Sequence, residues 1–123
     1  MCMVYNDDGT FLVEDRAKLD WPGLTFPGGH VKADETMEQS VVREIKEETG
    51  LDISKLEEVG VYEWNEPKQG VRHVAALYRT NVYKGILTPS KEGKVFWIRP
   101  EEVKNYKLST DMDKLLSIMR RGI

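Results

Sequence analysis

The chain has 123 residues, of which 40% are hydrophobic and 32% charged, and its formal net charge is −3. This length suits a single domain spanning residues 1–123, and no apolar run approaches the ~20 residues that a membrane span needs. The negative charge argues against duplex nucleic acid as the main partner, because such binding needs Lys and Arg to neutralise phosphates. The single cysteine, Cys2, excludes an internal disulfide and is compatible with a cytoplasmic protein.

The N-terminal part of the chain predicts a β-hairpin. Two short apolar runs, at 1–5 and 10–14, flank the segment NDDG at 6–9, which is typical of a tight turn between antiparallel strands. Residues 15–24 are polar and contain Pro22-Gly23, so they predict a loop. Cys2 lies within the first apolar run and is expected to be a small buried hydrophobe.

The clearest predicted helix covers residues 35–49. Gly50 stands where a helix commonly ends, and Thr36 with Gln39 three residues later has the spacing of a capping box. The helix carries an apolar face at helical spacing, made of Met37, Val41, Val42 and Ile45.

Further strands are predicted over 56–64, 71–83 and 95–98, followed by a short helix at 101–106 and a final helix at 111–121. Several strands mixed with few helices indicate an α+β fold in which helices cover the faces of a mixed β-sheet.

A group of carboxylates on the main predicted helix carries the chemistry. Glu44, Glu47 and Glu48 stand at positions i, i+3 and i+4, so their Cβ atoms lie about 5–6 Å apart on one helix face. Carboxylates held this close repel one another unless a cation neutralises them. A hard divalent ion such as Mg²⁺, which prefers carboxylate, water and phosphate oxygens, is the natural partner.

The segment GHVKADETMEQSVVREIKEETGL at 29–51 resembles the Nudix box, G-x5-E-x7-R-E-U-x-E-E-x-G-U with U apolar, at every fixed position. The preceding WPGLTFPG and the layout of elements extend the resemblance over nearly the whole chain. The resemblance implies an α/β/α sandwich of the Nudix hydrolases and, within them, the MutT type. It also implies hydrolysis of a phosphoanhydride bond with Mg²⁺, or with Mn²⁺ as a substitute.

The same resemblance assigns roles to the box residues. It implies that Glu44, Glu47 and Glu48 ligate the metal, together with the backbone carbonyl of Gly28 or Gly29. Arg43 is expected to orient a glutamate through an ion pair, and Glu35 to have a structural or more distant supporting role.

The general base is open between the box and a later loop. Glu92, just before the strand predicted at 95–98, resembles the loop glutamate of MutT-type members, and its alternative is an ordinary exposed acid. In the implied mechanism, a metal-bound or carboxylate-activated water attacks phosphorus.

Four residues are candidates for substrate contact. The resemblance suggests Arg16 for the phosphates, with an exposed loop arginine as the alternative. Arg72 is a candidate nucleotide or phosphate contact at the start of a strand, whereas His73 beside it is more typical of a packed strand histidine. Trp64 and Trp21 are candidates for stacking on a base.

Three functions remain open at this point. The leading hypothesis is a nucleoside triphosphate pyrophosphohydrolase that releases a nucleoside monophosphate and pyrophosphate, with oxidised purines such as 8-oxo-dGTP among its targets. The second is hydrolysis of another nucleoside diphosphate-linked substrate, such as ADP-ribose or a dinucleotide. The third, a non-catalytic nucleotide-binding domain, is disfavoured because the box carboxylates are all present. The partner is a small-molecule nucleotide in each case, and the chain is expected to be a monomer or a homodimer.

Overall fold

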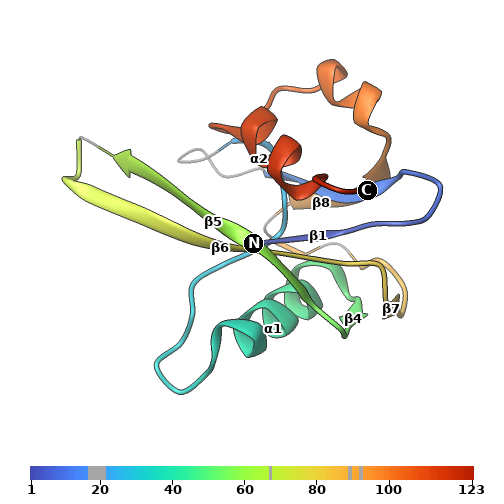
Figure 1. Cartoon of the computed structure of the whole chain (residues 1–123), viewed down its shortest axis with the longest axis horizontal. Coiled ribbons are helices and arrows are strands. Elements are labelled where there is room, and N and C mark those ends of the chain that lie inside the picture. The colour runs from blue at the N-terminus through green and yellow to red at the C-terminus, as the bar shows by residue number, and fades with distance from the viewer. Residues whose placement is uncertain (17–21, 67, 89, 92) are drawn as a thin grey trace.

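Helices cover both faces of the β-structure. The computed structural model of the chain describes residues 1–16, 22–66, 68–88, 90–91 and 93–123. The long helix α1 (Met37–Thr49) lies on one side of the strands, and α2 (Met112–Met119) lies on the other with the 3-10 helix η1 (Pro100–Asn105) (Figure 1). None of the helices in the described ranges has the length and apolar character needed to cross a bilayer.

The strands form two three-stranded sheets and one short pair. The first sheet has the order β1-β6-β5, from β1 (Cys2–Val4), β6 (Val71–Thr80) and β5 (Glu57–Glu66). The second has the order β3-β2-β8, from β3 (Gly23–Thr25), β2 (Phe11–Arg16) and β8 (Gly93–Ile98). The pair joins β4 (Asp52–Ile53) and β7 (Tyr83–Lys84). Only the β1–β6 ladder among these is parallel, so the expected mixed β-structure flanked by helices is confirmed.

Two hydrophobic cores lie on opposite faces of the strands. Along β2, Phe11 and Val13 point into the core beneath α2, whereas Leu12 between them points into the core beneath α1. Successive residues of a strand point to opposite faces, so a stretch covered on both sides is apolar at successive positions, as at residues 11–13 of β2. This explains why the first two strands appear in the sequence as continuous apolar runs.

Helix α1 begins and ends at residues that the sequence predicts. Thr36 caps its N-terminus by accepting a hydrogen bond from the Gln39 N–H, and the Gln39 side chain accepts one from the Thr36 N–H, so the capping box is confirmed. Gly50 ends the helix with φ of 82°, a left-handed conformation that glycine adopts at little cost. The helix starts two residues later than the predicted 35, and Glu35 is thereby left in the loop.

The predicted N-terminal hairpin is wrong in its pairing. A turn forms at 6–9, where the Gly9 N–H donates to the Asn6 carbonyl, but β1 and β2 share only the bridge between Tyr5 and Phe11. β1 instead pairs in parallel with β6, more than 70 residues away, with Cys2 opposite Tyr78. The turn residues at 6–9 reverse the chain as predicted. β1, which is buried on both faces, pairs with β6 and not with β2.

Two further predictions need correction. The strand predicted over 71–83 ends at Thr80, where the Thr80 hydroxyl accepts a hydrogen bond from the Val82 N–H and the chain turns into β7. The final helix starts at Met112 rather than 111, because Asp111 adopts a left-handed conformation with φ of 63°. Cys2 is fully buried as expected, and burial raises the pKa of its thiol to about 12.

Candidate active site

The loop before α1 is held against the carboxylates of the helix. The Gly28 N–H donates to Oε2 of Glu48 at 2.9 Å, and Glu48 is only 5% exposed. At Gly29, a Cβ atom would lie 2.5 and 2.6 Å from the two carboxylate oxygens of Glu44, so a side chain there would push that carboxylate aside. The glycines therefore allow the backbone to approach Glu44 and Glu48 directly.

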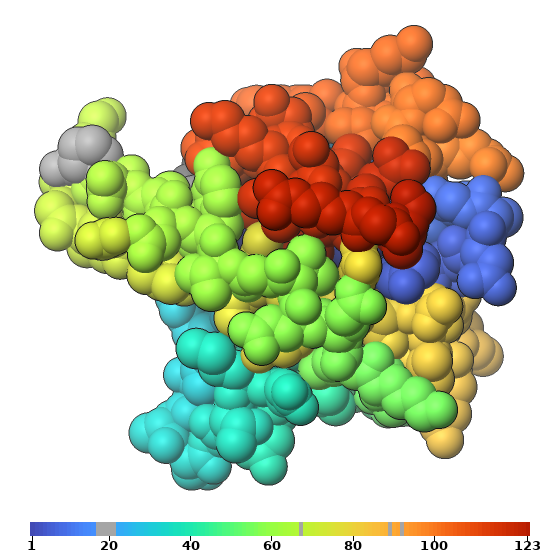
Figure 2. All heavy atoms as spheres, in the orientation of Figure 1, coloured from blue at the N-terminus to red at the C-terminus, as the bar shows by residue number. Residues whose placement is uncertain are grey.

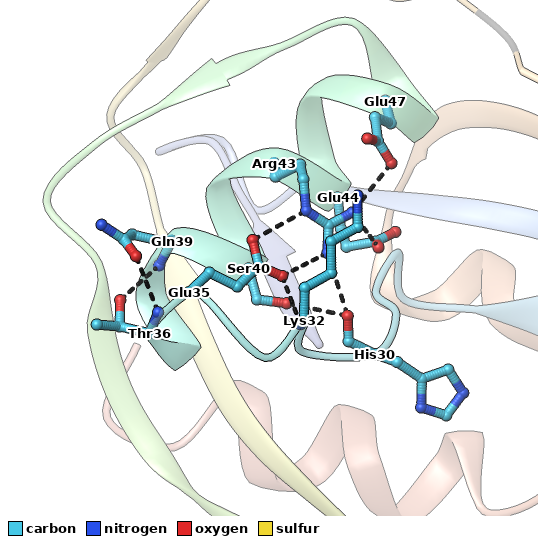
Figure 3. Close-up of polar contacts among 9 residues, drawn as sticks. All are labelled: His30, Lys32, Glu35, Thr36, Gln39, Ser40, Arg43, Glu44 and Glu47. Carbon is cyan, nitrogen blue, oxygen red and sulfur yellow. Dashed lines mark hydrogen bonds and ion pairs between the residues drawn. The ribbon is translucent and has the colours of Figure 1, made fainter.

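Arg43 is the electrostatic centre of the site (Figure 3). Its guanidinium binds Glu35 through two hydrogen bonds, from Nε at 3.0 Å and from Nη2 at 2.7 Å. Its Nη1 donates to Glu44 at 2.6 Å and to Glu47 at 3.2 Å, and Nη2 also donates to the backbone carbonyl of His30 at 3.1 Å. One arginine thus ties the loop before the helix to the two acidic positions on it.

The charge of Arg43 fixes the ionisation of Glu35. Hydrogen bonds from Arg43, and then one from the Lys32 N–H, lower the pKa of the Glu35 carboxyl to about 2. The same contacts with Glu35 and Glu44 raise the pKa of Arg43 above its usual value. Arg43 thus makes the ion pairs with glutamates that the sequence predicts, and Glu35 is one of its partners.

The carboxylates do not converge on a common point in this arrangement. Within the described ranges, no group of at least three His, Cys, Asp or Glu side chains is close enough together to hold a metal ion. Glu44 and Glu47 turn toward Arg43, while Glu48 accepts from Gly28. The donor set nevertheless fits a hard divalent cation, because it consists of carboxylate oxygens on one helix face beside an open backbone loop.

A cleft of about 510 Å³ opens beside the glycine loop. It runs from Gly28 and Gly29 along the hairpin of β5 and β6, which projects beyond the body of the molecule (Figure 2). On the α2 side the cleft is bounded by the segment that precedes this helix, including Ser109, Thr110 and Asp111. The volume lies in the range of small-molecule binding sites.

Aromatic side chains form one wall of the cleft. Tyr62 and Trp64 lie on the same face of β5, and the Trp64 ring stacks on that of His73 in β6 with centroids 4.9 Å apart. The Tyr62 hydroxyl donates to Oδ2 of Asp111 at 2.8 Å, which raises the pKa of Tyr62. This hydrogen bond joins the strand hairpin to the start of α2 across the cleft.

The structure brings some of the expected substrate residues together and separates another. Arg16 and Trp64 both line the cleft, and the buried Nε of Arg16 has no hydrogen-bond partner among the described residues. Arg72 lies outside the lining: it is next to His73 in the strand and so points to the opposite face, where it pairs with Glu63. Trp21 and Glu92 lie outside the described residues.

Sequence reasoning did not single out Asp111 or Glu66 as cleft residues, and it treated His73 as packing. Asp111 has the signature of an ordinary helix start, and Glu66 that of an exposed strand acid. Only the pairing of β5 with β6, and the packing of α2 over them, brings these side chains to one wall.

Comparison with known proteins agrees with this geometry. The family model described as NUDIX domain matches residues 1–117. The chain is 32% identical to the CTP pyrophosphohydrolase of Escherichia coli strain K12, over 83% of this chain and 76% of that protein. It is 36% identical to a MutT-like protein of Streptomyces ambofaciens, over 82% of this chain and 62% of that protein.

A solved structure shows the same fold. The MutT NUDIX hydrolase from Burkholderia pseudomallei aligns with a TM-score of 0.80 at 21% identity, covering 94% of this chain and 92% of that one. The complete box, the arginine-centred carboxylates and the match over most of the chain lead to one assignment. The chain belongs to the NUDIX domain family and is a MutT-type Nudix hydrolase, an enzyme that acts on phosphoanhydride bonds.

Proposed function

We propose that this enzyme hydrolyses a nucleoside triphosphate to a nucleoside monophosphate and pyrophosphate. The observation that carries the proposal is the single cleft that joins the box loop at Gly28 and Gly29 to an aromatic wall. The phosphate chain would lie at the box end and the base at the wall. The similarity to a CTP pyrophosphohydrolase supports this class of substrate. An oxidised purine triphosphate such as 8-oxo-dGTP is a candidate within the class.

The box residues would hold the metal ion that the family implies. Glu44, Glu47 and Glu48 offer carboxylate oxygens, and Gly28 or Gly29 offers a backbone carbonyl close to those of Glu44 and Glu48. When bound there, Mg²⁺ or Mn²⁺ neutralises phosphate charge and lowers the pKa of water. Arg43 would steer Glu44 and Glu47, and its ion pair with Glu35 keeps the guanidinium in place.

Arg16 is the proposed phosphate contact outside the box. Its Nε is buried at the cleft wall and without a partner in the described ranges, so a phosphate oxygen would satisfy a donor that otherwise costs free energy. Arg72 is not part of the proposed phosphate site, because it points away from the cleft and pairs with Glu63.

The experiment is a comparison of products over a panel of nucleotides. The panel contains CTP, dGTP, 8-oxo-dGTP, ADP-ribose and a dinucleoside polyphosphate, each with Mg²⁺ and with Mn²⁺. Pyrophosphate release from a triphosphate with the highest kcat/KM in the panel would support the proposal. Preferential turnover of ADP-ribose or the dinucleotide would overturn the substrate class while leaving the catalytic site intact. Metal binding without any turnover would favour the non-catalytic alternative.

A further inference from the structure

Trp64 and His73 form a stacked pair of rings in the aromatic wall of the cleft. Trp64 and His73 are directly opposite each other across β5 and β6, and their rings are nearly parallel, with an interplanar angle of 14°. Because β5 lies on one side of β6, the face of the His73 ring that is turned toward β5 is covered by Trp64. Among the described residues, Trp64 is the only ring in contact with His73.

The other side of β6 has no neighbouring strand at the level of His73. β5 accompanies β6 from Val71 to Arg79, but β1 pairs only with the last part of β6, from Tyr78 to Thr80. The sheet therefore has an open edge beside His73, within the part of the chain that the structure describes. His73 lines the cleft at this edge, with Ala75 and Ala76 nearer the box loop. The imidazole thus lines the cleft with one face against Trp64 and with no described strand beside the other.

The carboxylate of Glu66 lies beside the edge of the imidazole. Its Oε1 lies 3.0 Å from Nε2 of His73, and both side chains are about one quarter exposed, at 25% and 26%. Glu66 shares the strand face of Trp64 and also lines the cleft. One face of the ring therefore rests on Trp64, which limits the orientations open to the imidazole and pre-organises it at little entropic cost.

We propose that His73 is the residue on which the substrate's heteroaromatic base stacks, with Trp64 as the support behind it. The inference rests on the proposed function, because it requires a nucleotide substrate. It changes the role expected for Trp64, whose face toward β6 is already covered by the imidazole. Stacking depends on ring area, so a purine gains more from His73 than a pyrimidine does.

The test measures binding without turnover, by titration calorimetry with Mg²⁺. The probes are the α,β-methylene analogues of GTP and CTP, and inorganic tripolyphosphate, which has no base. His73→Ala should raise the Kd of the GTP analogue about tenfold and that of the CTP analogue by less, because base stacking on an aromatic residue has this order of magnitude. The Kd of tripolyphosphate should not change. His73→Phe, which keeps a ring face, should restore most of the affinity for the GTP analogue.

The controls separate this role from a structural one. Val71→Ala, at an exposed position of the same strand outside the cleft lining, should leave all three Kd values unchanged. An unchanged Kd for the GTP analogue in His73→Ala would overturn the inference. An equal loss of affinity for the GTP analogue and for tripolyphosphate would also overturn it, since a general distortion weakens both. If the wild-type protein bound tripolyphosphate but neither nucleotide, the proposed function itself would fail.

Discussion

Arg43 forms ion pairs with three glutamates whose side chains differ in solvent exposure. Glu35 and Glu44 are largely enclosed, with side chains 12% and 16% exposed, whereas Glu47 is 57% exposed. An exposed residue can be replaced with little effect on the fold. A substitution of Glu47 should therefore change activity without changing stability. A substitution of Glu35 should change the stability of the fold.

Glu47→Gln should lower kcat by at least about 100-fold, because loss of a metal-binding carboxylate costs more than loss of a supporting contact to a metal ligand. The melting temperature should change little, because the side chain is exposed and its contact with Arg43 is the longest of the set. Steady-state kinetics at saturating Mg²⁺ and a thermal melt measure both quantities. Glu38→Gln, in the first turn of the same helix, is the matched control. Turnover near the wild-type value would contradict the metal-binding role of Glu47.

Glu35 should make stability depend on acid pH. Its pKa is lowered from 4.5 to about 2 in the folded state, so the unfolded chain takes up this proton first as the pH falls. The contribution of ionised Glu35 to the free energy of unfolding is complete above the pKa that Glu35 has in the unfolded chain. It is lost as the pH falls from about 4.5 through about 2. The melting temperature of the wild type should therefore fall more steeply between about pH 5 and pH 3 than that of Glu35→Gln. Parallel curves would exclude this role, and Glu38→Gln should retain the wild-type slope.

Glu92, in the loop before β8 and outside the described residues, is one of the two candidates for the general base, beside the carboxylates of the box. Glu92→Gln should lower kcat by at least about 100-fold if this carboxylate accepts the proton of the attacking water. The KM should change less, because the residue would act on the water rather than hold the nucleotide. Glu101→Gln, at an exposed position of η1, is a matched control. Normal turnover in Glu92→Gln would return the role of base to the box.

At the scale of elements, α1 depends on its two ends. The capping box at Thr36 satisfies N–H groups that the first turn leaves without helical partners, and it fixes the point at which the loop with Glu35 enters the helix. The register of Arg43 against Glu35 follows from that entry point.

Thr36→Ala should lower the free energy of unfolding by about 1 kcal/mol, the usual cost of losing an N-cap side chain. Urea unfolding followed by circular dichroism would measure it. Ser117→Ala, at an exposed position inside α2, should change the free energy of unfolding by less than about 0.5 kcal/mol. Equal effects of the two substitutions would mean that the hydroxyl of Thr36 contributes nothing as a cap.

At the scale of the whole molecule, the strands are shared by two cores. β2 supplies Leu12 to the core beneath α1 and Phe11 to the core beneath α2, so neither core is complete without the same backbone. We therefore expect the two layers of helix to unfold together in one transition, as small domains usually do.

Leu12→Ala should lower the free energy of unfolding by about 2–5 kcal/mol, because it removes a fully buried side chain and leaves a cavity. Tryptophan fluorescence and far-ultraviolet circular dichroism should still give coincident transitions. Ile86→Ala, at a side chain that is 84% exposed, is the matched control and should change the free energy by less than about 0.5 kcal/mol. Separate transitions in Leu12→Ala would show that the two cores unfold independently.

Local patterns in the sequence were sufficient for the helix and for the box. Only neighbours within a few residues determine the caps of α1 and the spacing of Glu44, Glu47 and Glu48. Both can therefore be predicted from the sequence. The glycines before the helix follow in the same way, because Gly29 opens the box and Gly28 ends the segment WPGLTFPG that precedes it.

Only the tertiary structure decided the partner of β1 and the composition of the cleft wall. The turn at 6–9 suggested a hairpin, but burial on both faces moved β1 beside β6, and its short length left the edge of β6 open at His73. His73, Glu66 and Asp111 come from separate elements, and no local pattern relates them. By itself the sequence determined the box segment, since its residues lie on one continuous helix and loop. The cleft wall was decided by the fold, because long-range strand pairing and helix packing bring its residues together.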